Sequence, residues 1–385
     1  MNRRFFLLVP VLFALVACAA LHSRDKTHRR EARSRDTHSY QFVGYVTGKA
    51  DPAHIAAEKL TALDFAFAKI DANGDVVLQR AEDADFLASL RALKQRNPRL
   101  KVLISVGGWG ADGFSDAALG VESRERFADS AARLLAREQL DGIDIDWEYP
   151  TLPGPGIVHR PDDKQDFTLL LEALRTRLDA LALEQHRGRD APYLISAALG
   201  DREFVAGIEL DRVGRVLDWI NLMTYDFHNS LTPTTGHASS LARSATSAPN
   251  ERTVDSAVQQ FIDAGVPARK LVVGVPFYGH VFADVTAQNR GLDQPYGHHG
   301  DSPAWPRLVA DFIDRNGYSR YWDDAAHEPY LWNAQKREFV SYDDPRSLAL
   351  KAEFVKTHRL GGMMYWEQSQ DPDGELLGVI AAKLH

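Results

Sequence analysis

Short apolar segments alternate with amphipathic stretches along the chain from residue 41 onward. Apolar runs rich in β-branched and aromatic residues, and bounded by glycine, proline or asparagine, are typical of buried strands. Eight such segments cover residues 41–47, 62–68, 102–106, 141–150, 193–198, 219–225, 271–277 and 362–366. Eight strands that alternate with helices predict an α/β protein with a (β/α)8 TIM barrel. On this pattern alone, a doubly wound open sheet is the alternative.

The stretches between these segments have the apolar spacing of helices that pack one face on a sheet. Helical sequence runs from the Asn73-Gly74 turn to Asn97-Pro98, and a further helix covers residues 345–358. Residues 280–342 are too many for the single helix expected between the seventh and eighth strands. They are rich in aromatic residues: Trp305, Phe312, Tyr318, Tyr321, Trp322, Tyr330 and Trp332. This composition predicts a small α+β insertion subdomain with its own core beside the barrel mouth.

The fourth segment carries an unusual pattern of acids. In a strand, alternate side chains share a face, so Asp144, Asp146 and Glu148 lie on one face and Ile143 and Ile145 on the other. Neighbouring acids are then about 6.5–7 Å apart along the strand, and crowding of like charges raises at least one pKa. We therefore expect a proton to be held near Asp146 and Glu148 at neutral pH, as a general acid requires. A solvated acidic patch and a cation site are the alternatives, although no histidine interleaves to complete a metal shell.

The first residues read as an export signal. Arg3 and Arg4 precede an apolar run that ends at Ala17 and is short for a membrane span. The sole cysteine, Cys18, follows directly, in a sequence that resembles the bacterial lipoprotein box. The expectation is a signal peptide over residues 1–17, a lipidated Cys18, a disordered tether over 18–38 and the catalytic barrel over 39–385. Cleavage after Ala19 and secretion as a soluble protein is the alternative to a cell-envelope lipoprotein.

Net charge limits the kind of molecule that the chain can bind, and the cysteine count limits disulfide formation. The chain has 385 residues and a net charge of −8. Residues 1–40 contain eight Lys and Arg against three Asp and Glu, so the rest of the chain carries −13. This acidic body argues against nucleic-acid binding and suits a neutral substrate. One cysteine allows no disulfide within the chain.

Aromatic and acidic residues gather where the predicted strands end. In a barrel the carboxyl ends of the strands converge at one rim, where the chemistry lies. Besides the acids of the fourth segment, these ends carry Tyr45, Phe67, Trp109, Tyr225, Asp226, Tyr278 and Trp366. Rings stack on the apolar faces of sugars while acids act on the acetal oxygen. The rim therefore predicts a carbohydrate site.

The sequence Asp-Gly-Ile-Asp-Ile-Asp-Trp-Glu at 141–148 resembles the signature of the family 18 glycoside hydrolases, the chitinases and their relatives. Residues 105–109, 223–226, 275–279 and 361–367 are similar to the family motifs on the third, sixth, seventh and eighth strands. Residues 329–344 resemble the end of the chitinase insertion subdomain. The resemblance covers nearly the whole body and implies a bacterial chitinase with that subdomain.

The resemblance implies roles for individual residues. Glu148 would be the general acid and then the base, Asp146 would bind the acetamido group and exchange a proton with Glu148, and Asp144 would support Asp146. Tyr225 and Asp226 would hold the acetamido group, with Met223 packing nearby. Further substrate contacts are implied for Tyr45, Phe67, Trp109, Tyr278 and Trp366.

The implied reaction is retaining, substrate-assisted hydrolysis of β-1,4-linked N-acetylglucosamine polymers, with no metal or organic cofactor. The expected partner is chitin or a chitooligosaccharide, bound by a monomer that touches a membrane only through its lipid. Hydrolysis of peptidoglycan or an N-glycan core is one alternative. A non-catalytic chitin-binding lectin is another, although such relatives lose the acid that Glu148 retains. Two positions depart from the family pattern: residues 45–49 lack a Trp, and His280 stands where Arg is common.

Overall fold

The computed structural model describes residues 40–188 and 191–384. The predicted signal peptide, Cys18 and the tether lie outside the described residues. Within them, eight parallel strands form the barrel: β1 (Gln41–Val46), β2 (Ala62–Ile70), β4 (Lys101–Gly107), β5 (Gly142–Asp146), β6 (Leu194–Leu199), β7 (Trp219–Leu222), β8 (Leu271–Pro276) and β14 (Gly362–Trp366). Each strand pairs with the next, and β1 pairs with both β2 and β14. The sheet is therefore closed, which confirms the (β/α)8 barrel and excludes the open sheet.

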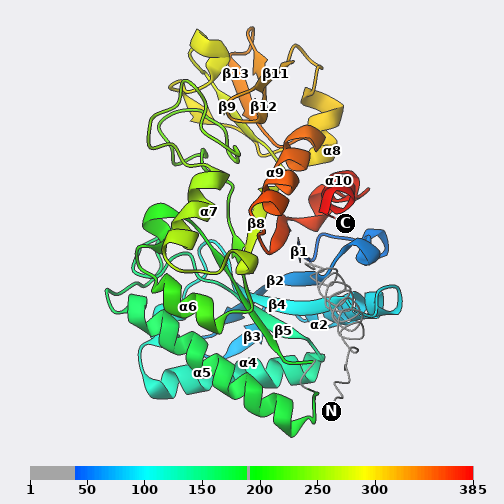
Figure 1. Ribbon diagram of the computed structural model, residues 1–385, viewed down its shortest axis with the longest axis vertical. Helices are drawn as coiled ribbons and strands as arrows, with labels where there is room; N and C mark the ends of the chain where they lie inside the picture. The colour runs from blue at the N-terminus through cyan, green and yellow to red at the C-terminus, as the bar shows by residue number, and fades with distance from the viewer. Residues whose placement is uncertain (1–39, 189–190, 385) are drawn as a thin grey trace, which may run out of the picture. The chain divides into compact units, whose positions relative to one another are not determined.

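Helices follow most strands and cover the outside of the barrel (Figure 1). They are α2 (Asp83–Ala92), α3 (Phe114–Ala118), α4 (Val121–Glu138), α5 (Asp163–Glu184), α6 (Leu210–Val216), α7 (Val254–Asp263), α9 (Pro345–Thr357) and α10 (Glu375–Leu384). The short α8 (Trp305–Arg307) lies instead in the segment that forms the second sheet. One prediction was wrong in detail: the stretch after Asn73-Gly74 first forms β3 (Val76–Leu78), which pairs antiparallel with β2. The tight turn at Gly74 returns the chain as a hairpin before the helix begins.

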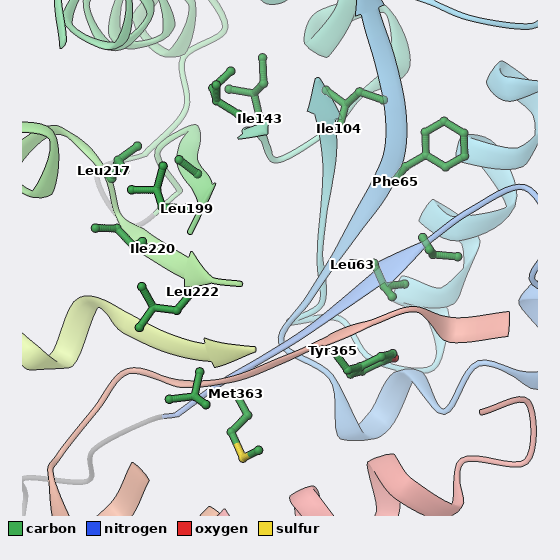
Figure 2. Close-up of a cluster of buried hydrophobic side chains, with 14 of the residues drawn as sticks. Leu63, Phe65, Ile104, Ile143, Leu199, Leu217, Ile220, Leu222, Met363 and Tyr365 are labelled. Carbon is green, nitrogen blue, oxygen red and sulfur yellow. The ribbon is translucent and has the colours of Figure 1, made fainter. Parts of the chain in front are cut away.

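The main core lies between the barrel and these helices. Outward residues of several strands, including Ile104, Ile143 and Ile220, point into one continuous apolar cluster (Figure 2). Ile143 and Ile145 are both fully buried there, and each contributes about 1.5–3 kcal/mol through burial of its side chain. This burial confirms the outward apolar face predicted for the acidic strand, so the alternate residues of β5 point into the barrel.

A second, antiparallel sheet lies between β8 and β14 in the sequence. Its order is β10-β9-β13-β12-β11. The strands are β9 (His280–Ala283), β10 (His298–His299), β11 (Ser319–Asp323), β12 (Glu328–Asn333) and β13 (Glu338–Ser341). A separate apolar cluster packs on it, formed by Phe282, Val285, Leu292, Tyr330, Trp332 and Phe339. The chain enters this sheet directly after β8, through β9. In the pairing of β9 with β13, His280 lies opposite Ser341.

A buried ion cluster joins this sheet to the barrel helices. Lys351 on α9 is fully buried, and its Nζ lies 2.6 and 2.7 Å from the two oxygens of Asp343. The same Nζ lies 3.3 Å from Glu328 on β12 and 3.0 Å from the Ser239 hydroxyl. Burial, and then the charge of Asp343, raise the pKa of Glu328 well above its usual value. The cluster holds α9, β12 and the loop after β7 together.

None of the described helices combines the length and apolarity that a membrane span requires.

Candidate active site

Strand register brings three polar residues to one level inside the barrel. Asp144 on β5 is paired with Ser105 on β4 and Ser196 on β6. Both hydroxyls donate to Asp144 at 2.7 Å, and the Tyr45 hydroxyl donates at 2.8 Å. Burial raises the pKa of Asp144, and these hydrogen bonds oppose the rise. Asp144 is therefore a rigidly held group with no exposed surface.

Asn221 on β7 connects this group to a fourth carboxyl. The Trp219 indole N–H donates to Asn221 Oδ1 at 3.1 Å. Because that indole can only donate, it orients the amide. The amide Nδ2 then faces the Tyr45 hydroxyl at 3.1 Å, Asp64 Oδ2 at 3.2 Å and Asp144 Oδ1 at 3.4 Å. Burial and the charge of Asp144 raise the pKa of Asp64 well above its usual value, which favours the neutral form of Asp64.

Three residues of this network were not predicted from the sequence: Asp64, Ser196 and Asn221. Each interrupts a run of apolar residues within its strand, and each is fully buried. Strand alternation could have found these three residues, because each of them lies on the inward face of its strand, opposite to the outward apolar residues. Polarity at an inward position of a predicted barrel strand would have identified them.

Asp146 lies one inward position further along β5, and its surroundings depend on two glycines. Gly107 is its register partner on β4, and Gly108 N donates to the Asp146 carbonyl at 2.9 Å. A Cβ on Gly107 would lie 2.0 Å from that carbonyl oxygen, and its φ is +120°. The backbone of the β4 glycine segment is therefore in direct contact with the acidic strand. Burial, and then the charges of Glu148 and Asp144, raise the pKa of Asp146 well above its usual value. Among the described residues its Oδ1 has no hydrogen-bond partner.

Glu148 follows β5 at the rim and is partly exposed. Burial raises the pKa of Glu148 to about 7, with a further contribution from the charge of Asp226 and an opposing hydrogen bond from Tyr149. A carboxyl group with a pKa near the working pH can both donate and accept a proton. The Glu148 carboxyl is therefore suited to proton transfer near neutral pH.

Tyr225 and Asp226 lie beside these acids at the end of β7. Burial raises the pKa of Tyr225 well above its usual value, and the charge of Asp146 adds to the rise. Asp226 Oδ1 accepts from the Tyr278 hydroxyl at 2.7 Å and lies 2.7 Å from His280 Nε2. Burial raises the pKa of Asp226, but these two contacts and the charge of His280 outweigh it and lower the pKa overall. The Asp226 side chain is 42% exposed, so an anchored carboxylate faces the solvent.

Aromatic residues surround the acids as the sequence predicted, with one difference. Trp366 stacks on Phe67 with ring centroids 5.6 Å apart and also contacts Tyr45 at 5.6 Å. Trp109 is 57% exposed and meets the Tyr149 ring edge-on. Tyr45, however, is 1% exposed. It lies beneath the acids with its hydroxyl engaged by Asp144, so it supports the site instead of lining a substrate subsite.

Met223 is partly buried and packs on the apolar cluster inside the barrel, under the Tyr225 segment. No group of three or more His, Cys, Asp or Glu among residues 40–188 and 191–384 is arranged to hold a metal ion. A surface depression of about 370 Å³ lies beside the β2–β3 turn, and its walls include Asp71, Asp112 and Arg126. None of the predicted site residues lines this depression, so it is separate from the candidate active site at the barrel rim.

Comparison with known proteins identifies the family. The model of the glycosyl hydrolases family 18 matches residues 41–371, which include every strand of the barrel. The chain belongs to this family. The family description and the relatives named chitinases assign this family 18 chain to the glycoside hydrolases.

Individual relatives agree with this assignment. Chitinase A1 of Niallia circulans is 40% identical over 311 residues, which are 77% of this chain and 44% of that protein. The chain thus spans less than half the length of that relative. A family 18 N-acetylglucosaminidase from Paenibacillus barengoltzii has a TM-score of 0.82 and 37% identity, and the match covers 90% of this chain and all of the other. A chitinase from Cycas revoluta, solved in complex with (GlcNAc)4, has a TM-score of 0.78 and 26% identity, with 90% of this chain and all of the other covered.

Proposed function

We propose that this family 18 chain is a chitinase that hydrolyses β-1,4-linked N-acetylglucosamine polymers, with Glu148 as the general acid and base. The observation that carries the proposal is the Glu148 carboxyl at the rim, whose pKa is raised to about 7 by burial. Asp146 beside it also has a raised pKa, so protons are available where a glycosidic oxygen would lie. Relatives named for chitin or N-acetylglucosamine hydrolysis support the substrate class.

In the proposed reaction, Glu148 protonates the glycosidic oxygen while the N-acetyl oxygen of the substrate attacks C1. The bond between C1 and the glycosidic oxygen breaks, and a cyclic oxazolinium intermediate forms. Water then attacks C1, the bond from C1 to the N-acetyl oxygen breaks and regenerates the acetamido group, and Glu148 takes a proton from the water, so the product keeps the starting anomeric configuration. Asp146 accepts a hydrogen bond from the acetamido N–H and stabilises the positive intermediate, and Asp144 supports Asp146 from below.

The arrangement of the acids favours this route over a protein nucleophile. A conventional retaining hydrolase needs a second carboxylate across the sugar, about 5–5.5 Å from the acid. Asp144, Asp146 and Glu148 all come from the one β5 segment. Asp226 comes from another strand end, but its Oδ1 is occupied by Tyr278 and His280. In the proposal, Asp226 and Tyr225 orient the acetamido group, and Trp366 and Trp109 stack on sugar rings.

The test is a Glu148→Gln variant, with Glu125→Gln on the exposed face of α4 as the matched control. The amide keeps the shape of the side chain but donates no proton to a leaving group. We expect binding of an N-acetylglucosamine oligomer to persist while turnover falls by about 10²–10⁴-fold, with the control unchanged. Undiminished turnover in Glu148→Gln would overturn the assignment of Glu148. Binding without turnover in the unaltered chain would indicate a lectin.

Product analysis separates the alternative substrates. The similarity to an N-acetylglucosaminidase favours release of single sugars as a second candidate activity. Chitin oligomers, peptidoglycan and a glycoprotein are compared as substrates, with the anomeric configuration followed at early times. Retained anomers from chitin oligomers support the proposal, inverted anomers contradict its mechanism, and exclusive cleavage of peptidoglycan or N-glycans replaces its substrate.

We further propose that the chain is exported through a signal peptide over residues 1–17 and held at the cell envelope by a lipid on Cys18. In this scheme residues 18–38 are a tether, 39–385 form the monomeric catalytic unit, and about 280–342 form its insertion subdomain. The support is the basic and apolar leader ending at the sole cysteine. A Cys18→Ser variant should move from the membrane fraction to the soluble fraction and lose incorporated fatty acid. Unchanged fractionation would favour cleavage after Ala19.

A further inference from the structure

His280 connects the barrel acids to the second sheet through both of its ring nitrogens. It is the first residue of β9, separated from the end of β8 by three residues, and its side chain is 8% exposed. Its Nε2 lies 2.7 Å from Asp226 Oδ1, and its Nδ1 lies 2.9 Å from His299 Nε2 on β10. The Ser302 hydroxyl is more distant, at 3.5 Å from Nδ1. Two imidazoles therefore lie in series behind one carboxylate.

The contact between the two rings limits how many protons the pair can hold. A carboxylate only accepts, so His280 Nε2 carries a proton toward Asp226. At 2.9 Å, one proton can lie between His280 Nδ1 and His299 Nε2, while two would repel each other. The pair thus keeps its contact when it is neutral or carries one positive charge, and loses it when both rings are charged.

Few other charges face the pair. Asp226 lies on the barrel side, the Tyr278 ring packs edge-on against His280, and Asp301 flanks His299. Asp301 pairs with Arg307, and Arg252 contributes positive charge near Asp226. On β10, His298 pairs instead with the exposed Asp284. Burial, and then the charge of His280, lower the pKa of His299, so His299 gains its proton only in acid.

We propose that His280 and His299 are positioning residues that share one proton and hold Asp226 ionised, with Oδ1 anchored and Oδ2 turned toward the substrate. Among the described residues, Oδ2 of Asp226 receives no hydrogen bond, whereas Oδ1 receives two. When both rings are charged they separate, and the His280 ring loses the contact with His299 that fixes its orientation toward Asp226. Substrate affinity then falls in acid, while the chemistry at Glu148 is unaffected by this step. The inference rests on the proposed function, because it assigns Asp226 to substrate binding.

The kinetic test compares KM and kcat for a soluble N-acetylglucosamine oligomer at about pH 7.5 and about pH 5, on either side of the ordinary histidine range. In the unaltered chain we expect KM to rise about tenfold in acid, equivalent to about 1.4 kcal/mol. His299→Gln retains an uncharged amide that can donate or accept and does not titrate, so its KM should rise less than about twofold. His280→Arg retains a permanent cation beside Asp226 and should also have a flat KM profile. His298→Gln, the neighbouring control, should follow the unaltered chain.

A second measurement does not depend on turnover. Nitrogen-15 NMR of the imidazole rings is followed through a pH titration of the full chain and of His299→Gln. We expect one ring of the pair to remain neutral well below the pH at which the other is charged, and the His280 signals to change in the variant. Independent titration of the two rings at one midpoint, or an equal acid rise of KM in His299→Gln, would overturn the inference. Failure of the proposed function would instead appear as unchanged turnover in Glu148→Gln, with the NMR result intact.

Discussion

The contact between Gly107 and the catalytic strand allows a prediction whose magnitude follows from the geometry. An added Cβ at Gly107 would lie 2.0 Å from the Asp146 carbonyl oxygen and 2.9 Å from the Phe114 ring, at a φ of +120°. Positive φ costs a non-glycine residue about 1–3 kcal/mol, and forced overpacking costs about 1–3 kcal/mol more. We expect Gly107→Ala to lower the free energy of unfolding by about 2–6 kcal/mol in total.

Gly156 provides the matched control because its φ is +98° but a Cβ there would meet nothing within 4 Å. Gly156→Ala should therefore show only the backbone cost of about 1–3 kcal/mol. Equilibrium urea unfolding measures both variants. The backbone contact can relax only by moving Gly107 or Asp146, and a displacement of about 1 Å at a catalytic group costs about 10²-fold in rate.

Initial rates on an N-acetylglucosamine oligomer complete the comparison. Gly107→Ala should lose about 10²-fold in kcat at temperatures where it remains folded, while Gly156→Ala should keep the rate of the unaltered chain. Equal losses of stability in the two variants would show that the contact with Asp146 carries no energy. A folded Gly107→Ala variant with full kcat would show that the position of Asp146 does not limit the reaction.

Three further predictions follow from buried charges. Because Glu148 must be protonated for the first step and its pKa is about 7, kcat measured across pH should fall as pH rises through about 7; a rate that holds well into alkali would contradict this assignment. The pKa of Asp64 is raised in the folded chain. The unaltered chain should therefore lose stability relative to Asp64→Asn as the pH rises above about 3.9, the pKa of Asp in the unfolded chain. Urea unfolding at several pH values measures this difference, and parallel stability curves would contradict a raised pKa at Asp64. Lys351→Met should lower the free energy of unfolding by about 3–5 kcal/mol because it leaves Asp343 without its buried partner. Lys356→Met, at an exposed pair with Glu353, should change it by less than about 1 kcal/mol. Equal shifts of the melting temperature in the two variants would argue against a stabilising role of the ion cluster.

Much of the barrel could be predicted because strand and helix periodicities are local. The alternation of Ile143 and Ile145 with Asp144 and Asp146 assigned the two faces of β5, and both isoleucines are fully buried on the outer face. The short strand β3 was missed because a three-residue strand after a turn has too few positions to establish a period. Tyr45 was predicted to contact substrate, but its side chain is buried inside the barrel. The strand pattern does not say whether a ring at a strand end points out of the barrel or into it, and here its hydroxyl donates to the Asp144 carboxylate inside.

Local pattern alone determined that eight strands alternate with helices and that one strand presents three acids on a single face. Only the tertiary structure decided which residues those acids meet, because Asp64, Ser196, Asn221 and His299 come from strands far apart in sequence, whose relative register no local pattern encodes. The strand pattern predicted a raised pKa near Asp146 and Glu148 from like charges. At Glu148 the tertiary structure decided the main cause of that rise, which is burial in the closed barrel.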